Sequence, residues 1–302
     1  MKRVWGKPVS GMIKNNTANQ TGLPEDFRIA LLVLYIFILL AGTLNVVLMS
    51  CMLQSQRRLS FTKVSVINLI AVHFFFLLTV PFRIYYYASE DWILGIHFCK
   101  IVSFMIHAHM YLAFIFYVFL LIVRFLEHSD RQHKLQFHRL LHATITSATV
   151  WLVIFGSMLP ATIKNYGMKQ NDSTRCFHFG QAVTQPSVKT LNFFICIVVI
   201  LVWSVLAIIQ GYFLLRVFRK FGKATRQRQE FWAQLKNVVF LLVMFFCFVP
   251  YQGFRIYYVR DYGKTKEMDY INEIFLAVTA FSCFDMIVFA GRDVWKLINS
   301  RG

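Results

Sequence analysis

The sequence predicts an all-α membrane protein, a bundle of seven transmembrane helices. Of its 302 residues, 57% are hydrophobic and only 15% are charged, whereas about a quarter are charged in an average soluble domain. Seven apolar stretches are long enough to cross about 30 Å of hydrocarbon as a helix, and none alternates as a barrel strand would. Each stretch must satisfy its own backbone hydrogen bonds in lipid, which a helix does.

The seven predicted helices follow one another with short connections, which leave no room for a soluble domain. Their approximate spans are 28–53, 61–88, 97–126, 138–160, 188–218, 231–259 and 269–290. Because no internal repeat or linker interrupts them, residues 28–290 form one predicted transmembrane domain.

The two ends of the chain are predicted to lie outside this domain. Residues 1–27 are basic and polar and lack the apolar core of a cleaved signal peptide, so the first helix is expected to act as its own signal anchor. In residues 291–302, Trp295 and its apolar neighbours stand against Arg292 and Lys296. This pattern is typical of a short amphipathic helix on a membrane surface.

Charge predicts the orientation of the bundle. Basic residues gather in the connections after the first, third and fifth helices and in the tail, and such residues mark the cytosolic side. Most of the net charge of +18 therefore faces anionic lipid, and a nucleic-acid partner is not needed to explain it. The glycosylation acceptors Asn15, Asn19 and Asn171 fall on the opposite side. We expect a plasma-membrane protein with an extracellular N-terminus and a cytosolic C-terminus.

The six cysteines fall into two groups. Four lie within apolar helices, where a thiol behaves as a small hydrophobe, and no function is assigned to them: Cys51, Cys196, Cys247 and Cys283. Cys99 and Cys176 both fall in the oxidising compartment, where disulfides form. Their pairing would hold the second outer loop across the start of the third helix.

A spacing motif and an intramembrane arginine resemble a known family. Trp92, Gly95 and Cys99 form W-x-x-G-x-x-x-C between the second and third helices, and Arg124 follows 25 residues after Cys99. This arrangement is similar to that of the rhodopsin-like (class A) G-protein-coupled receptors, in which an arginine of the D-R-Y motif occupies the latter place. Matching residues occur in five of the other helices: Asn45, Pro81, Trp151, Pro160, "CFVPY" and "DMIVF". Longer stretches such as "AVHFFFLLTVPFR" and "PYQGFRIYY" resemble one orphan receptor of the family.

The resemblance implies a receptor that transmits an extracellular ligand signal to heterotrimeric G proteins. It implies no enzymatic activity and no cofactor, and the sequence shows no nucleophile with its base and no phosphate-binding glycine loop. The motifs depart from the family at several places, since D-R-Y reads Val123, Arg124, Phe125 and N-P-x-x-Y reads "DMIVF". A decoy receptor without G-protein output therefore remains an alternative. A transporter predicts inverted repeats or broken helices, and none is visible.

Arg124 is predicted to be part of the activation switch. An arginine in an apolar helix needs a partner or water; the alternative is a side chain that reaches the lipid headgroups. Glu230, twenty residues before Pro250, is the predicted partner, and the alternative for it is a solvated side chain at a helix start. Phe248 stands where the family has a tryptophan, and Pro250 marks the expected hinge.

His73 and Asp285 form a second predicted switch pair. His73 stands eight residues before Pro81, in the slot of the acid that helps to hold sodium in the family, and Asp285 begins "DMIVF". A hydrogen bond between them would reduce the cost of burying the carboxylate. The alternative is a water-bridged polar pocket without a regulatory role, and His109 is left as a packed or water-bonded histidine.

The predicted ligand site lies in the outer half of the bundle. Two guanidinium groups beside aromatic side chains suit an anionic, amphipathic small molecule. The candidate ligand-binding residues are Arg83, His107, Tyr111, Gln252 and Arg255. Alternatively, the arginines pair with acids of the outer loops, such as Glu90 or Glu273. No metal site is expected, because the histidines of the loop "EHSDRQHKLQFHRLLH" are irregularly spaced and no cysteine joins them.

Overall fold

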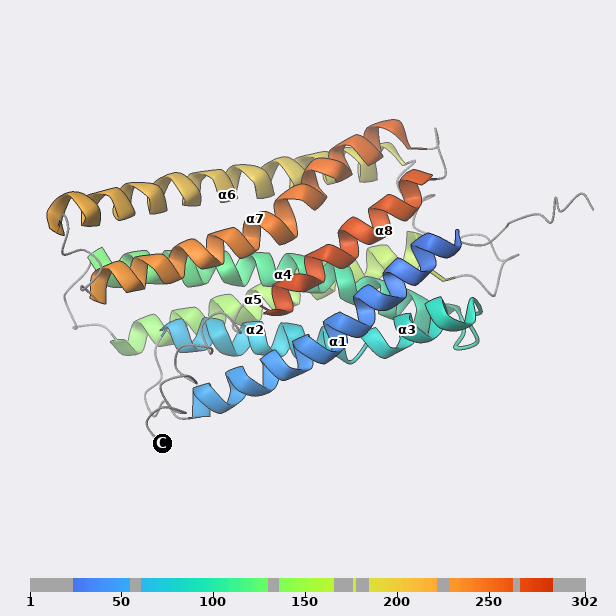
Figure 1. Ribbon diagram of the computed structural model, residues 1–302, viewed down its shortest axis with the longest axis horizontal. Coiled ribbons are helices and arrows are strands. Elements are labelled where there is room, and N and C mark those ends of the chain that lie inside the picture. The colour runs from blue at the N-terminus through green and yellow to red at the C-terminus, as the bar shows by residue number, and fades with distance from the viewer. Residues whose placement is uncertain are drawn as a thin grey trace, which may run out of the picture.

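The structure is a computed structural model that describes residues 24–54, 61–129, 136–165, 176–177, 185–221, 229–262 and 267–284. Within these residues the chain forms one bundle of helices (Figure 1). The elements are α1 Glu25–Gln54, α2 Phe61–Leu77, α3 Val80–Ser89, α4 Ile96–Ser129, α5 Gln136–Asn165, α6 Pro186–Phe221, α7 Gln229–Asp261, α8 Glu267–Thr279 and η3 Ala280–Phe284. With α2 and α3 forming the second helix and α8 and η3 the seventh, the predicted all-α, seven-transmembrane bundle is confirmed. Of the predicted N-terminal segment 1–27, only residues 24–27 are described, and α1 begins within them. The predicted amphipathic C-terminal helix lies outside the described residues.

Six stretches of the described chain are long and apolar enough to cross a membrane. They are Glu25–Gln54, Thr62–Ser89, Ile96–Phe125, Leu141–Pro160, Pro186–Lys220 and Gln234–Asp261. Each agrees with one predicted span to within a few residues. The seventh predicted span, 269–290, is described only as far as residue 284.

The second helix is interrupted within its predicted span of 61–88: α2 ends at Leu77 and α3 begins at Val80. Pro81 explains the break, because proline has no N–H and its ring displaces the carbonyl four residues earlier. The chain tightens there: the Thr79 amide donates to the Phe76 carbonyl at 2.8 Å, and the Thr79 hydroxyl donates to the same oxygen at 2.6 Å.

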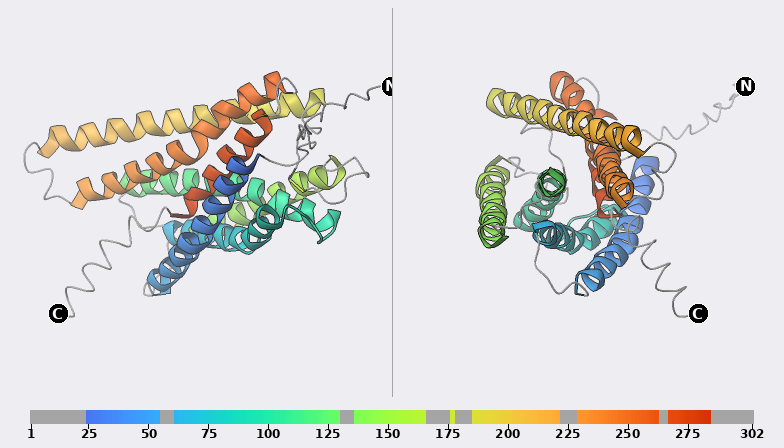
Figure 2. Two further views of the ribbon diagram at one scale, coloured as in Figure 1. Left: turned by 45° about the vertical axis from the view of Figure 1, so that its right-hand side comes forward. Right: turned by 90° about the vertical axis from the view of Figure 1, so that its left-hand side faces the viewer.

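Helix α4 lies toward the inside of the bundle, whereas α5 lies at its edge (Figure 2). In the most apolar stretch of α4 61% of the residues are buried, against 6% in that of α5. The α4 helix therefore meets helices on several sides. Several of the buried polar contacts below involve one of its side chains.

The seventh helix changes form where it reaches the middle of the bundle. At Ala280 the α-helix gives way to a 3₁₀ helix, a tighter form used in short pieces and often near functional sites. Two carbonyls of this piece accept hydrogen bonds from neighbouring helices: Cys283 from the Asn45 side chain at 2.5 Å and Ser282 from the Tyr117 hydroxyl at 3.0 Å. The irregular backbone is therefore held by side chains of α1 and α4.

Candidate functional site

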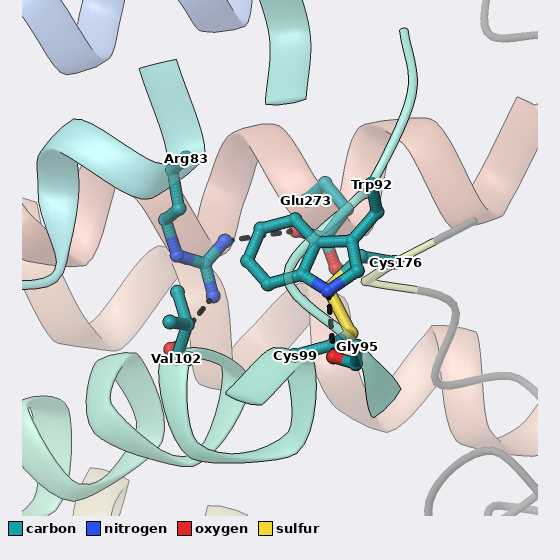
Figure 3. The surroundings of a disulfide bond; sticks show 7 residues. All are labelled: Arg83, Trp92, Gly95, Cys99, Val102, Cys176 and Glu273. Carbon is teal, nitrogen blue, oxygen red and sulfur yellow. Dashed lines mark hydrogen bonds and ion pairs between the residues drawn. A yellow bond between two sulfur atoms is a disulfide. The ribbon is translucent and has the colours of Figure 1, made fainter. Parts of the chain in front are cut away.

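One end of the bundle is closed by the predicted disulfide, and we call it the disulfide end. Cys99 and Cys176 are bonded, with their Cα atoms 5.8 Å apart, so this prediction is confirmed. Gly95 has a positive φ of 78°, which glycine adopts at little cost, and its carbonyl accepts a hydrogen bond from the Trp92 indole at 2.8 Å (Figure 3). This turn places the W-x-x-G-x-x-x-C motif over the start of α4.

Arg83 is completely buried just beneath the disulfide. Its guanidinium group lies between α4 and α8 (Figure 3), 3.5 Å from the Val102 carbonyl and 3.8 Å from the Glu273 carboxylate. It also donates to the Tyr35 hydroxyl at 3.2 Å, and the Phe177 ring lies 4.2 Å away. Arg83 therefore contacts α1, α4, α8 and the segment that carries Phe177. Its contact with Glu273 is the ion pair that the sequence left open as an alternative to ligand binding.

Arg255 reaches the same helix, α8, from α7. Its guanidinium group donates to the Asn272 side chain at 3.0 Å and to the Asn192 side chain of α6 at 3.4 Å, and its centre lies 5.1 Å from the Tyr258 ring. Each of these partners is neutral, and the residue is only 8% exposed. Because a guanidinium group is not deprotonated in a protein, Arg255 keeps its positive charge there and can attract an anion.

The three other predicted ligand residues lie on α4 and α7. His107 is half-buried, with Nδ1 3.0 Å from the Ser103 carbonyl of its own helix. Tyr111, one turn further on the same face, is also half-buried. Gln252 is buried and donates to the Met110 sulfur at 3.7 Å. These contacts do not test the predicted ligand roles, which stay predictions.

The disulfide end carries an excess of buried positive charge. Among the described residues, the buried arginines and carboxylates are Arg83, Arg255 and Glu273, two cations and one anion. Asn272 and Glu273 are adjacent on α8 and contact one arginine each. Asn272 is not among the predicted site residues, although an Asn-Glu pair within an apolar helix is itself a signal of a functional site.

At the opposite end, which we call the Arg124 end, one partner of the arginine is a neutral side chain. Half-buried Arg124 donates from Nη1 to the Asn237 side-chain oxygen of α7 at 3.1 Å, and its guanidinium group lies 4.8 Å from the Phe240 ring. The predicted partner Glu230 is in α7, but its side chain lies outside the described residues, so the Arg124–Glu230 contact stays a prediction. Asn237 was missed, because an amide near a helix end carries no distinctive signal.

The predicted hinge region packs tightly against α4. Phe248 is completely buried, and its ring centroid lies 5.8 Å from that of Phe114 and 6.2 Å from that of Tyr117. Pro250 lies inside α7, where it removes one backbone hydrogen bond. A rotation of α7 at this point would have to move Phe248 against α4.

A third polar cluster lies in the middle of the bundle. His73 Nδ1 is 3.0 Å from His109 Nε2, and the Cys283 sulfur is 3.4 Å from each of these nitrogens. The predicted partner of His73, Asp285, lies outside the described residues. The sequence left His109 as a packed or water-bonded residue and gave Cys283 no function, and the structure brings both against His73.

Other predicted sites fall where the chain is not described. These are the glycosylation acceptors Asn15, Asn19 and Asn171 and, within the histidine-rich segment 127–142, residues 130–135.

The disulfide over the central helix, the interrupted second helix and the arginines held at both ends define a seven-helix membrane receptor. The family model described as "7 transmembrane receptor (rhodopsin family)" matches residues 44–288, and the chain belongs to this family. The probable G-protein coupled receptor 141 of Homo sapiens is 38% identical over 287 residues, which cover 93% of this chain and 94% of the relative. The resemblance of the longer sequence stretches is thereby confirmed.

More distant relatives match over most of the chain or over part of it. The probable G-protein coupled receptor 34 of Pan troglodytes is 25% identical over 291 residues, 90% of this chain and 76% of the relative. The lysophosphatidic acid receptor 6 of Mus musculus is 30% identical over 196 residues, 63% of this chain and 56% of the relative.

Proposed function

We propose that this protein is a plasma-membrane receptor that couples an extracellular ligand to heterotrimeric G proteins. Membership of the rhodopsin family supports this class of function. The distribution of basic residues supports an orientation with the disulfide end and the N-terminus outside the cell and the Arg124 end in the cytosol. The receptor itself carries out no covalent chemistry.

The proposed ligand is anionic and amphipathic, with a carboxylate or phosphate head and an apolar body. The observation that carries this proposal is the environment of Arg255, a buried cation whose partners are two neutral amides and an aromatic ring. Charge-assisted contacts of arginine with carboxylate or phosphate are strong and directional. Arg83 supplies a second guanidinium group, whose charge Glu273 offsets.

The name of one relative agrees with this ligand chemistry. The lysophosphatidic acid receptor 6 is named for a lipid with one acyl chain and a phosphate head. A ligand of that general class would place its phosphate near Arg255 and its chain among the aromatic side chains. We extend only the class of ligand to this protein, not the particular lipid.

In the proposed activation step, ligand binding at the disulfide end favours a state in which α7 swings outward about Pro250. The contact of Arg124 with Asn237 joins α4 to α7, so it would hold the resting state. A hydrogen bond to a charged group contributes about 1.5–3 kcal/mol, which is small enough for a ligand to overcome. Its loss would expose Arg124 to the G protein.

Nucleotide exchange on purified G proteins by the receptor in lipid nanodiscs tests the proposal. The lipids added would share one acyl chain and differ in head group, namely phosphate, zwitterionic phosphocholine or neutral glycerol. We expect stimulation by the phosphate lipid alone. In the Arg255→Gln variant the required concentration should rise roughly tenfold or more, because about 1.4 kcal/mol of lost interaction is a factor of ten.

Arg260→Gln is the matched control, since Arg260 lies on the same helix but is exposed. It should leave the response unchanged. Equal stimulation by the neutral lipid would contradict the anionic ligand. Lipid binding that depends on Arg255 without any nucleotide exchange would instead support the decoy receptor.

A further inference from the structure

The polar cluster in the middle of the bundle has the composition of a metal site. His73 from α2, His109 from α4 and Cys283 from η3 are 0%, 1% and 0% exposed, and their ligand atoms lie within 4.8 Å of one another. Imidazole nitrogen and thiolate sulfur together favour zinc and monovalent copper over magnesium or calcium. Among the described residues, the group contains no carboxylate.

We propose that His73, His109 and Cys283 bind a zinc ion that joins the second, third and seventh transmembrane helices. The proposal is independent of the proposed ligand and of G-protein coupling. The Cys283 thiol gives up its proton to solvent on binding, and one position on the ion stays open for water.

The spacing of the three ligand atoms fits one face of a tetrahedron. With Zn–N of about 2.05 Å and Zn–S of about 2.3 Å, tetrahedral angles give N···N of about 3.3 Å and N···S of about 3.6 Å. The structure has 3.0 Å between the two nitrogens and 3.4 Å from the sulfur to each nitrogen. A shift of a few tenths of an ångström would therefore seat the ion, and the open fourth corner is the arrangement of an exchangeable site.

Hydrogen bonds alone satisfy this cluster poorly. The cluster has three contacts, one between the two ring nitrogens and one from the sulfur to each nitrogen. If both imidazoles are neutral, at most two of these contacts can be hydrogen bonds, one donated by an N–H and one by the S–H. The third contact then has no hydrogen of its own. A single cation at the centre satisfies all three atoms at once, because each presents a lone pair to it.

Neighbouring residues hold two of the three ligands in place. The outer ring nitrogens, His73 Nε2 and His109 Nδ1, have no hydrogen-bond partner among the described residues, although metal-bound histidines are usually oriented through that nitrogen. The Phe76 ring stacks on His109 with centroids 4.3 Å apart. The Asn45 amide donates to the Cys283 carbonyl at 2.5 Å. Gly42 allows the close approach of α1, since a Cβ at that position would lie 3.4 Å from the Cys283 Cβ and 2.9 Å from the Leu77 side chain.

Metal analysis of the full-length receptor in nanodiscs tests the site. The protein would be stripped with EDTA, loaded with zinc, dialysed against metal-free buffer and assayed for zinc per chain. We expect the wild type to retain one ion per chain more than Cys283→Ser. The matched control is Cys247→Ser, which removes another buried cysteine, on α7, and should retain as much zinc as the wild type. Equal zinc in all three proteins would assign the metal to other histidines and overturn the proposal.

Replacing zinc by cobalt gives a second measurement that needs only the wild-type protein. It can therefore be made even if Cys283→Ser fails to fold. Co²⁺ bound at this site should show the near-ultraviolet thiolate-to-metal charge-transfer band and the intense visible bands of a four-coordinate ion. Absence of the charge-transfer band from the wild type would leave a hydrogen-bonded triad and refute the metal site. Retention of Cu⁺ without binding of Zn²⁺ or Co²⁺ would refute the assignment to a divalent ion.

Discussion

The two ends of the bundle hold their arginines in different ways. At the disulfide end, Arg83 is completely buried and lies 3.8 Å from a carboxylate that is itself buried. At the Arg124 end, the arginine is half-buried and donates to the neutral amide of Asn237 at 3.1 Å. One arrangement places opposite charges out of water, and the other places a cation beside an uncharged acceptor.

This difference indicates which contact stabilises the structure and which can act as a switch. Removal of one member of a buried ion pair leaves an uncompensated charge, which is strongly destabilising. A hydrogen bond between a half-buried cation and a neutral amide is weaker, and water can replace it. The disulfide end is therefore suited to hold a fixed frame around a ligand, and the Arg124 end is suited to open.

The largest effect should follow from removal of the buried cation. The Arg83→Met variant keeps the volume of the side chain but leaves the Glu273 carboxylate without its cation, so the free energy of unfolding should fall by about 3–5 kcal/mol. Denaturant unfolding of the purified receptor in detergent micelles measures this loss.

The double variant Arg83→Met, Glu273→Gln is the control for that measurement. It removes both charges, so much of the lost stability should return. If the unfolding free energy of Arg83→Met lies within about 1 kcal/mol of the wild-type value, the range of exposed ion pairs, then the buried ion pair is not a structural contact and the two ends do not differ in this way.

A smaller and functional effect is expected at the Arg124 end. Asn237→Ala removes an acceptor worth about 1.5–3 kcal/mol, so the active state should become more populated and basal nucleotide exchange should rise. Asn237→Asp provides a charged acceptor and should lower basal exchange. Both are measured at equal surface expression with purified G protein.

Gln234→Ala separates this contact from general loosening of α7. Gln234 lies one turn earlier on the same helix, but it accepts from Gln210 of α6 at 2.9 Å. It should therefore leave basal exchange closer to the wild type than Asn237→Ala does. If Glu230→Ala raises basal exchange while Asn237→Ala does not, then Glu230 is the restraining partner of Arg124.

Which helices exist was predictable from sequence, but how each is rotated was not. A run of some twenty apolar residues specifies a membrane helix by length alone, and the described helices agree with the predicted spans. A helix that is apolar all round has no sequence signal for the face that it buries. For that reason the contacts of His73 with His109 and Cys283, and of Arg124 with Asn237, could not be predicted from the sequence.

Local irregularities were only partly predictable. Pro81 was recognised as a family position, but the break between Leu77 and Val80 depends on how the chain tightens before the proline. The 3₁₀ piece at Ala280–Phe284 has no proline to mark it. Its carbonyls bond to side chains of Asn45 and Tyr117, residues more than 160 positions away in the sequence, so only the assembled bundle defines it.

The smallest effect should come from an ion pair that lies at the disulfide end but is open to solvent. Arg28 and Glu90 are 2.7 Å apart, closer than Arg83 and Glu273, yet their side chains are 24% and 55% exposed. Exposed pairs contribute about 0–1 kcal/mol and are screened by salt, so Glu90→Gln should lower the unfolding free energy by less than about 1 kcal/mol. Unfolding at low and high ionic strength would separate the two pairs, because the effect of Glu90→Gln should vanish in salt and that of Arg83→Met should persist. A loss at Glu90 as large as that at Arg83 would mean that distance, rather than burial, decides the strength of these contacts.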